Sequence, residues 1–114
     1  MASFNKYRAK KTNCAQGHTH GSKKEALRCN ALSQMQQRGE ISKLEQQPQF
    51  WFAIGGRPLK HANGHRVGYK ADFRYVDADG RVVIEEVKGF SVRDWPLRRA
   101  VFLALFPDLI FREV

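Results

Sequence analysis

The sequence has few cysteines, no long apolar run and few acidic residues, and each shortage excludes a class of protein. Its two cysteines, Cys14 and Cys29, provide no disulfide framework, so we expect a reducing, intracellular compartment. No apolar stretch approaches the ~18 residues needed to span a bilayer, and the first residues lack the apolar core of a signal peptide. We therefore expect a cytoplasmic protein without a membrane segment.

The shortage of acids leaves a strongly basic chain. Asp and Glu total 11 against 20 Lys and Arg, which gives a formal net charge of +9. A small basic domain most often meets nucleic acid, with anionic lipid as the alternative. The 114 residues, 42% of them hydrophobic, suffice for one domain with a modest core. We expect a single domain over residues 1–114, in which residues 1–21 form a basic arm and a Cys/His loop.

Both cysteines and half of the histidines lie within sixteen residues. Zinc accepts such a Cys₂His₂ set in a closed tetrahedral site. However, the spacing Cys-x₃-His-x-His-x₈-Cys is not that of a standard zinc finger, and its last cysteine would lie in a helix. A small buried cysteine with loop histidines is the simpler interpretation, and structural zinc is the alternative. The candidate zinc ligands are Cys14, His18, His20 and Cys29.

The first clear element is a helix that begins after Ser22. Ser22 and Glu25 form a capping box, and Gly39 is suited to the position that ends the helix. Glu25 lies at the border of the apolar face, from which an acid could reach the sheet that the helix covers. The apolar positions at helical spacing are Ala26, Leu27, Ala31, Leu32 and Met35.

A strand is predicted at 50–54, where Phe50, Phe52 and Ile54 alternate with other residues. We expect these aromatic side chains to lie in the core, and a base-stacking platform is the less favoured alternative. Residues 55–68 then form a glycine-rich, basic connection. Because long loops in compact domains are often functional, we expect this one to grip DNA, with solvated turns as the competing interpretation.

A β-hairpin is predicted from Tyr69 to Gly89, closed by a three-residue loop that ends at Gly80. This register places Asp72 directly opposite Glu86. Side chains alternate along a strand, so Glu86 and Lys88 share one face while Glu85 points to the other. Opposed carboxylates repel each other, and a divalent cation such as Mg²⁺ removes that penalty. The hairpin therefore predicts a metal-dependent site that cleaves phosphodiesters.

The chain after the hairpin predicts one more helix and one more strand. Asp94 can cap a helix with Pro96 in its first turn, Pro107 stops that helix, and 109–114 reads as a strand. A strand, a helix and a parallel strand make a right-handed crossover. The expected fold is α+β, with the order α-β-β-β-α-β and a mixed four-stranded sheet flanked by helices.

An Asp on one strand and Glu-x-Lys on the next, within this order of elements, resembles the PD-(D/E)XK nuclease superfamily, whose core is restriction-endonuclease-like. The match here is Asp72 followed by Glu86-Val87-Lys88. The segments Ser-Lys-Lys-Glu-Ala, Leu-Glu-Gln-Gln-Pro-Gln-Phe and Glu-Glu-Val-Lys-Gly resemble small phage and prophage proteins within that superfamily. One departure is Ala71, which stands where the superfamily name expects proline.

The resemblance implies a role for each matching residue. Asp72, Glu86 and the main-chain carbonyl of Val87 would bind Mg²⁺ or Mn²⁺. Lys88 would orient or activate the attacking water and stabilise charge on the phosphate. Glu25 matches the helix acid that many members place beside the metal, so it belongs to both the catalytic and the metal-binding set.

The predicted function is a metal-dependent DNA endonuclease of phage or prophage origin, which acts in a host cell in DNA processing, recombination or repair. One alternative is a non-catalytic nucleic-acid-binding module with a nuclease-like fold, and another is a zinc-stabilised interaction protein. A homodimer or a larger phage DNA-processing complex is left open by the small size of the chain. The expected DNA contacts are Arg57, Lys60, Arg66, Lys70, Arg98 and Arg99.

Overall fold

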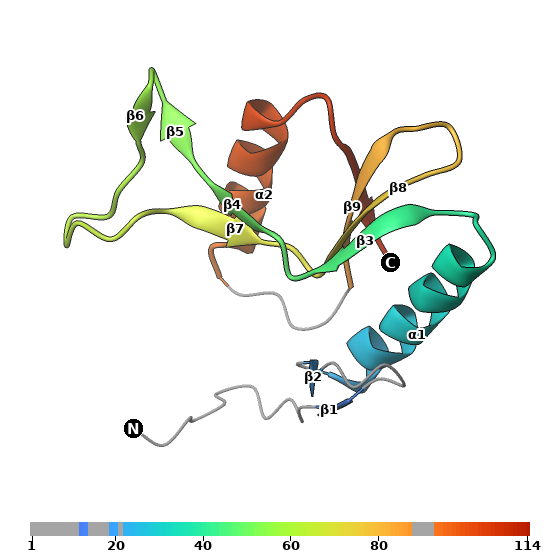
Figure 1. Cartoon of the computed structure of the whole chain (residues 1–114). Coiled ribbons are helices and arrows are strands. Elements are labelled where there is room, and N and C mark those ends of the chain that lie inside the picture. The colour runs from blue at the N-terminus through green and yellow to red at the C-terminus, as the bar shows by residue number, and fades with distance from the viewer. Residues whose placement is uncertain (1–11, 14–18, 21, 88–92) are drawn as a thin grey trace.

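The computed structural model describes residues 12–13, 19–20, 22–87 and 93–114, the last two ranges with their side chains. Two helices and ten strands lie within these ranges (Figure 1). The helices are α1 (Lys23–Gln37) and α2 (Trp95–Leu105). The strands are β1 (Thr12–Asn13), β2 (Thr19–His20), β3 (Ser42–Gln46), β4 (Gln49–Trp51), β5 (Ala53–Ile54), β6 (Arg57–Pro58), β7 (Gly68–Lys70), β8 (Phe73–Val76), β9 (Val82–Glu86) and β10 (Ile110–Glu113).

The central element is a four-stranded mixed sheet with the order β10-β9-β8-β3. Strand β8 is antiparallel to both β3 and β9, and β10 joins β9 in parallel after the α2 crossover. The order along the chain is therefore α1-β3-β8-β9-α2-β10. This confirms the expected α+β class and its mixed four-stranded sheet with flanking helices.

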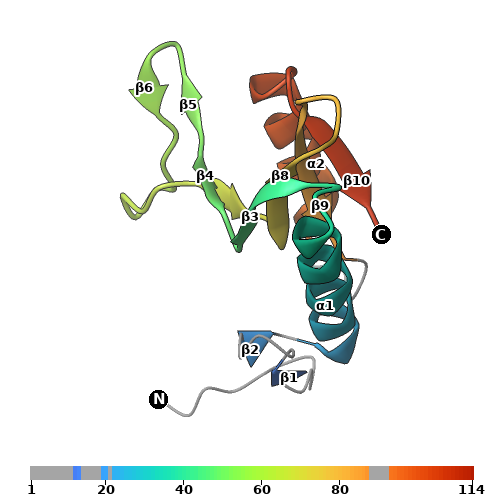
Figure 2. The ribbon, with the colours of Figure 1, turned by 45° about the vertical axis from the view of Figure 1, so that its right-hand side comes forward.

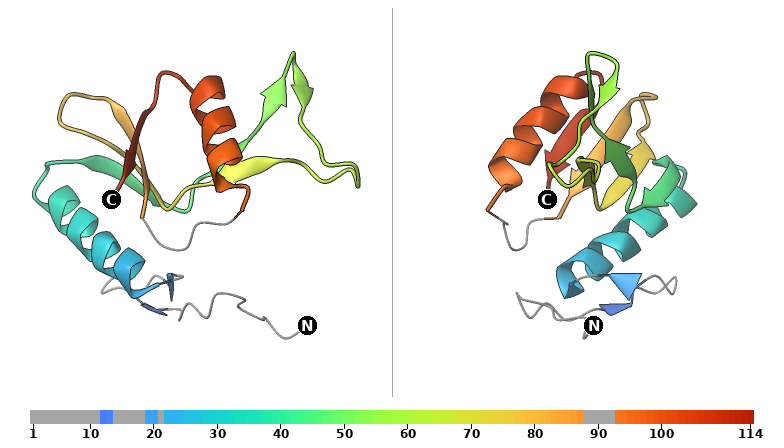
Figure 3. Two further views of the ribbon diagram at one scale, coloured as in Figure 1. Left: turned by 180° about the vertical axis from the view of Figure 1, so that it is seen from behind. Right: turned by 90° about the vertical axis from the view of Figure 1, so that its left-hand side faces the viewer.

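The two helices cover opposite faces of this sheet (Figure 3). Neighbouring residues on β9 show the division, because Val83 packs with the α1 side chains and Ile84 with the α2 side chains. Side chains of consecutive strand residues point to opposite faces. A sheet covered on both faces needs apolar residues at successive positions, which Val82, Val83 and Ile84 supply.

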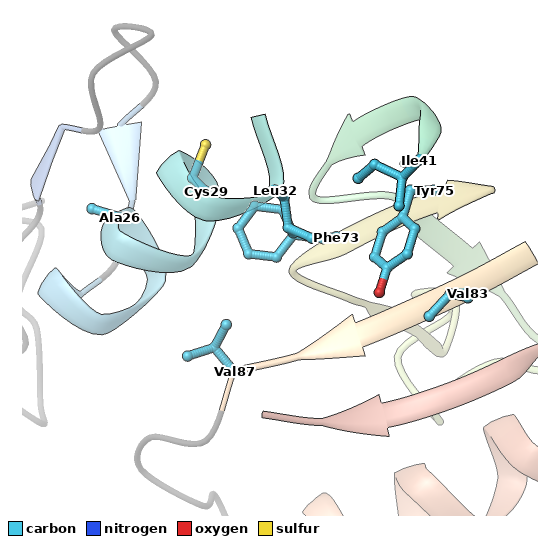
Figure 4. Close-up of a cluster of buried hydrophobic side chains, with 8 residues drawn as sticks. All are labelled: Ala26, Cys29, Leu32, Ile41, Phe73, Tyr75, Val83 and Val87. Carbon is cyan, nitrogen blue, oxygen red and sulfur yellow. The ribbon is translucent and has the colours of Figure 1, made fainter. Parts of the chain in front are cut away.

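Figure 4 shows the core beneath α1, a cluster that contains Ala26, Cys29 and Leu32 of the helix together with Phe73 and Val87. Ala26, Cys29 and Leu32 are almost fully buried. The helix begins as predicted, since Ser22 Oγ accepts a hydrogen bond from Glu25 N at 3.1 Å, and it ends at Gly39 with φ of 77°. One expected core residue is wrong: Leu27 lies on the outer side of the helix and is 60% exposed.

The hairpin between β8 and β9 has the predicted register. Asp77 N donates to Arg81 O at 2.9 Å, and Gly80 closes the three-residue loop with φ of 80°. Phe73 pairs with Glu85, so the next position along each strand places Asp72 opposite Glu86. A left-handed backbone at Gly80 is what this loop requires, and glycine adopts it without steric cost.

The strands on either side of the hairpin differ from the prediction. The strand beside β8 is β3, and the predicted strand at 50–54 lies outside the sheet as β4 and β5. The alternation of β3 is hidden because the register shifts between Ser42 and Glu45, where Lys43 adopts a left-handed φ of 56°. The first strand of the predicted hairpin is also divided in two: β7 pairs with β4, and β8 begins after Asp72.

Residues 49–70, which contain β4 to β7, form an extension that we call the arm. It leaves the sheet beside α2 and carries the β5–β6 hairpin away from the body of the protein (Figures 1 and 2). Phe52 is 1% exposed and anchors the arm in the core, where it exchanges backbone hydrogen bonds with Val67 and Leu59. Ile54, the last residue of the predicted strand, is 55% exposed because the hairpin has passed beyond the core by that residue.

The α2 face of the sheet is lined by aromatic rings. Phe102 is the most deeply buried residue of α2, and its ring meets those of Tyr69 at 4.9 Å and Phe50 at 5.0 Å. Edge-to-face contacts at these separations add to the free energy gained from burial. Leu97, in the first turn of α2, is apolar but 69% exposed.

A buried ion pair joins α1 to the sheet. Glu85 is fully buried, and its two carboxylate oxygens accept from Arg28 Nε and Nη2, each at 2.7 Å. The hydroxyl of Tyr75 also donates to Glu85. Glu85 thus lies on the α1 face, as its position in the hairpin predicted, and its negative charge is held by a bidentate partner.

Arg28→Ala removes the guanidinium and leaves the buried Glu85 carboxylate without its cation. Breaking a buried pair from one side is strongly destabilising. Because the Arg28 side chain is 30% exposed, we expect the low end of the usual range, a loss of roughly 3 kcal/mol in the free energy of unfolding. Urea unfolding followed by circular dichroism measures it.

The matched control is Arg38→Ala, which breaks the exposed pair between Arg38 and Glu40 near the other end of the same helix. Exposed pairs contribute little, so the unfolding midpoint of this variant should stay at that of the wild type. Equal midpoints for Arg28→Ala and Arg38→Ala would contradict the structural role given to Glu85.

Candidate active site

Three carboxyl groups from separate segments meet at one end of the central sheet. Asp72 precedes β8, Glu86 ends β9, and Glu25 lies in the first turn of α1. Asp72 and Glu86 are half-buried, and Glu25 is 7% exposed. The fold thus brings together three of the acids that the sequence nominated, although 61 positions separate Glu25 from Glu86 (86 − 25).

The pKa of the Asp72 carboxyl is raised to about 8, far above its ordinary value. Burial is the largest cause, and the charge of Glu86 is the next. Glu25 raises the pKa further by its charge and by a side-chain hydrogen bond with Asp72. The backbone N–H of Val87 opposes these effects, since it donates to Asp72 Oδ2 at 2.7 Å. Near neutral pH this cluster therefore retains a proton.

The pKa of Glu86 is raised for similar reasons. Burial raises the pKa of its carboxyl, and the charges of Glu25 and Glu113 raise it further. The hydroxyl of Tyr69 donates to Glu86 Oε1 and works in the other direction by stabilising the ionised form. Burial and this bond together raise the pKa of Tyr69. The phenol therefore stays protonated and holds the Glu86 side chain in place.

Glu25 combines the two roles that the sequence suggested for it. Its backbone N–H takes part in the cap with Ser22, while its carboxyl reaches Asp72. In a capping box the N3 side chain would instead turn back toward the N-cap backbone. The contact with Asp72 adds a second role for this side chain at the cluster of acids.

Several predicted site residues lie outside the described residues. These are Lys88, Cys14 and His18. His20 belongs to β2, and Cys29 is fully buried in the core of α1, where Gln46 Nε2 lies 3.8 Å from its sulfur. The simpler interpretation of Cys29 as a small buried residue is thus consistent with its position.

Within the described ranges, no group of three or more His, Cys, Asp or Glu side chains is arranged as a ready metal site. Each acid also has a partner within the protein. One oxygen of Asp72 accepts from Val87 N, one oxygen of Glu86 accepts from Tyr69, and Glu25 bonds to Asp72. The three carboxyls are close enough to raise the pKa values of Asp72 and Glu86.

The predicted DNA contacts fall into two groups. Arg57, Lys60, Arg66 and Lys70 are exposed on the arm. Arg98 and Arg99 of α2 have partners within the protein: Arg98 bonds to Asp94 at 2.6 Å and to the carbonyl of Gly68, and Arg99 bonds to Glu113 at 2.7 Å. Both α2 arginines therefore hold the structure around the site together. Asp94 uses its carboxylate for Arg98, and no side-chain cap of α2 forms.

The model of one protein family, described as "Protein of unknown function (DUF1064)", matches residues 4–113. The chain belongs to the DUF1064 family. Comparison with curated proteins and with solved structures gave no match. None of the helices in the described part of this DUF1064 protein has the length and apolar character required to cross a membrane.

Two residues of the cluster in this DUF1064 protein were not found from the sequence. Tyr69 was placed in the hairpin strand without a role, and Glu113 was placed in the last strand. Glu113 pairs with Glu86 in the register of β10 and β9. The register of a parallel strand is not set by a tight turn, so the sequence contains no signal for this neighbour. Tyr69 had no signal either, because a residue three positions before Asp72 in one regular strand would lie on the opposite face.

Asp72→Asn tests, in metal-free buffer, whether Asp72 is destabilised by burial and by repulsion from Glu86 and Glu25. Between about pH 4 and pH 8 the folded protein keeps a proton that the unfolded chain has released, so raising the pH lowers the free energy of unfolding. Asparagine removes this cost and can still accept from Val87 N. We expect Tm in EDTA to rise by at least about 4 °C at pH 9, which corresponds to 1 kcal/mol in a domain of this size.

At pH 5 the gain from Asp72→Asn should be small, because the folded wild type is then protonated at Asp72. The matched control is Asp108→Asn in the exposed turn before β10, which should change Tm equally at the two pH values. A gain at Asp72 that is the same at pH 5 and pH 9 would show that the acids do not repel one another in the folded protein.

Proposed function

We propose that this protein is a divalent-metal-dependent nuclease that hydrolyses phosphodiester bonds of DNA, with its site at Asp72 and Glu86. The observation that carries the proposal is the meeting of Asp72, Glu86 and Glu25, with raised pKa values at Asp72 and Glu86. A cluster that destabilises its own ionised form is a poor structural device. It is a common feature of sites that bind a cation.

The donor chemistry fits Mg²⁺ or Mn²⁺. Both ions take carboxylate oxygens together with water and substrate oxygens, and one or two carboxylates suffice. Asp72 and Glu86 would hold the ion, with the carbonyl of Val87 beside them, and Glu25 would complete the acidic set. When bound, such an ion lowers the pKa of water and neutralises charge on the phosphate. The oxygens that now accept from Val87 N and Tyr69 would keep these side chains oriented.

The remaining roles belong to the chain itself. Lys88 would place a compact positive charge next to the phosphate and orient the attacking water, as the PD-(D/E)XK resemblance implies. Tyr69 would hold Glu86 through its hydroxyl, and Arg99 would neutralise Glu113 next to Glu86. The exposed cations of the arm would hold the phosphate backbone without reading sequence.

The alternative is a nucleic-acid-binding module that has this fold and no catalysis. This alternative is favoured because no three acids among the described residues are arranged as a ready metal site. The repulsion between Asp72 and Glu86 favours the nuclease, because a pure binding module gains nothing from acids opposite each other where DNA would lie.

We expect the purified full-length protein to cleave DNA with Mg²⁺ or Mn²⁺ and not with EDTA. A panel of duplex, single-stranded, branched and flapped substrates, followed on denaturing gels, makes the measurement. Asp72→Ala and Lys88→Ala should each lower the cleavage rate by at least about 100-fold, the scale of one lost electrostatic group at a reacting centre.

The control variant is Asp79→Ala, which removes an exposed acid of the hairpin turn and should cleave at the wild-type rate. Binding of the same DNA in EDTA should persist in Asp72→Ala, because that variant loses a negative charge. If no substrate of the panel is cleaved while binding is retained, the non-catalytic module is the correct reading.

A further inference from the structure

The arm carries charge of one sign only, a property that it shares with residues 1–24. From residue 46 to residue 71 the sequence contains Arg57, Lys60, Arg66 and Lys70 and no Asp or Glu. All four cations are exposed. The arm is also thin, since nearly all residues from 53 to 66 are exposed and the β5–β6 hairpin leaves the body of the protein (Figure 2). Such a segment is attracted to a polyanion and contributes little to the core.

Trp51 is the large aromatic residue on the outside of this arm. It lies between Phe50 and Phe52, which pack in the core, and its own side chain is 49% exposed. Alternation along the strand directs it away from the aromatic cluster. Phe50 and Phe52, the alternating aromatic residues expected in the core, do pack there, and Trp51 between them lies on the other side.

The Trp51 ring is held in place from two directions. Its cross-strand partner is Gly68, and a Cβ atom at Gly68 would come within 2.8 Å of Trp51 Cε3 and 2.4 Å of Phe50 O. Only glycine leaves room for the ring to lie against β7. The guanidinium of Arg66 lies over the ring, with Cζ 5.4 Å from its centroid. The ring is thus fixed before any partner binds.

A purely structural role, in which Trp51 covers the backbone at Gly68, would explain the contact on one side of the ring. It would not explain why the rest of the ring is exposed beside cations. An aromatic ring half open to water, beside an arginine and on a segment free of acids, has the elements of a base-stacking site. Stacking on such a ring tolerates any base, and nearby cations hold the phosphates. In an intact duplex the faces of the bases are already stacked and out of reach.

We propose that Trp51 is a stacking platform for an unpaired base, and that the arm gives this protein a preference for nucleic acid with unpaired nucleotides over intact duplex. Trp51 supplies the ring, Arg66 moves from its place over the ring to neutralise a neighbouring phosphate as the base stacks there, and Lys70 contacts the backbone toward the acids. This deepens the proposed function by naming its substrate class, yet binding at the arm needs neither the metal nor the acids.

Trp51 fluorescence tests the proposal directly. The chain has two tryptophans, so Trp95→Phe in the full-length protein leaves Trp51 as the single emitter. A 12-nucleotide single-stranded DNA, titrated in EDTA so that no cleavage occurs, should quench this emission as a base stacks on the ring. The same strand in a blunt duplex should quench far less, as should a 12-residue abasic strand that keeps the phosphates but has no bases.

Trp51→Leu keeps an apolar cover over Gly68 and removes the stacking ring. We expect it to weaken binding of the single strand by about 5-fold to 100-fold, the range for one stacked base, and binding of the duplex by less than about 2-fold. Trp51→Phe should restore most of the loss. The matched control is Leu97→Ala, which removes an exposed apolar side chain on α2 and should leave both affinities unchanged.

Equal losses for single strand and duplex in Trp51→Leu, or unquenched Trp51 emission in a saturated complex, would overturn the proposal. Should Trp51→Leu fail to fold, the quenching in Trp95→Phe decides alone. The two proposals fail separately. Binding with quenching but no cleavage rejects the nuclease and keeps the platform, whereas cleavage that is unaltered by Trp51→Leu rejects the platform and keeps the nuclease.

Discussion

An ionised carboxylate that is buried away from water needs a positively charged partner. In this structure Arg28 is that partner for Glu85, and the position of α1 depends on their contact. The bidentate pair fixes α1 against β9 with both hydrogen bonds at 2.7 Å. Glu25 lies one helical turn before Arg28, on the same side of α1. The pair that seats the helix therefore also carries the Glu25 carboxyl to Asp72, so the site depends on the same contact as the core.

Two adjacent glutamates serve opposite purposes because strand residues alternate between faces. Glu85 is buried under α1 and neutralised, whereas Glu86 lies on the α2 face with Tyr69 and with other acids. One glutamate contributes to stability and the other costs it. Such a cost at one point of a well-packed fold is common where a protein binds a ligand, because the ligand removes it.

The arm and the body of the protein also differ in what they contribute. The central sheet and two helices hold the acids in place, while the arm extends away from that body (Figure 1) and exposes its cations and Trp51. A two-stranded hairpin is marginal by itself, and Phe52 supplies the anchor in the core. In the proposed function, the basic arm would bind the nucleic acid and the neighbouring cluster of acids would carry out the cleavage.

The sequence alone determined the elements that local signals encode: α1 through its cap and terminal glycine, the hairpin register through Gly80, and the order of the crossover. It also placed Asp72 opposite Glu86, since a three-residue loop fixes every pair behind it. Tertiary structure alone decided the rest. A bulge hid β3, and Arg28 meets Glu85 across 57 residues. Such partners are chosen by packing and by the match of buried charge, and neither has a period or spacing that a sequence displays.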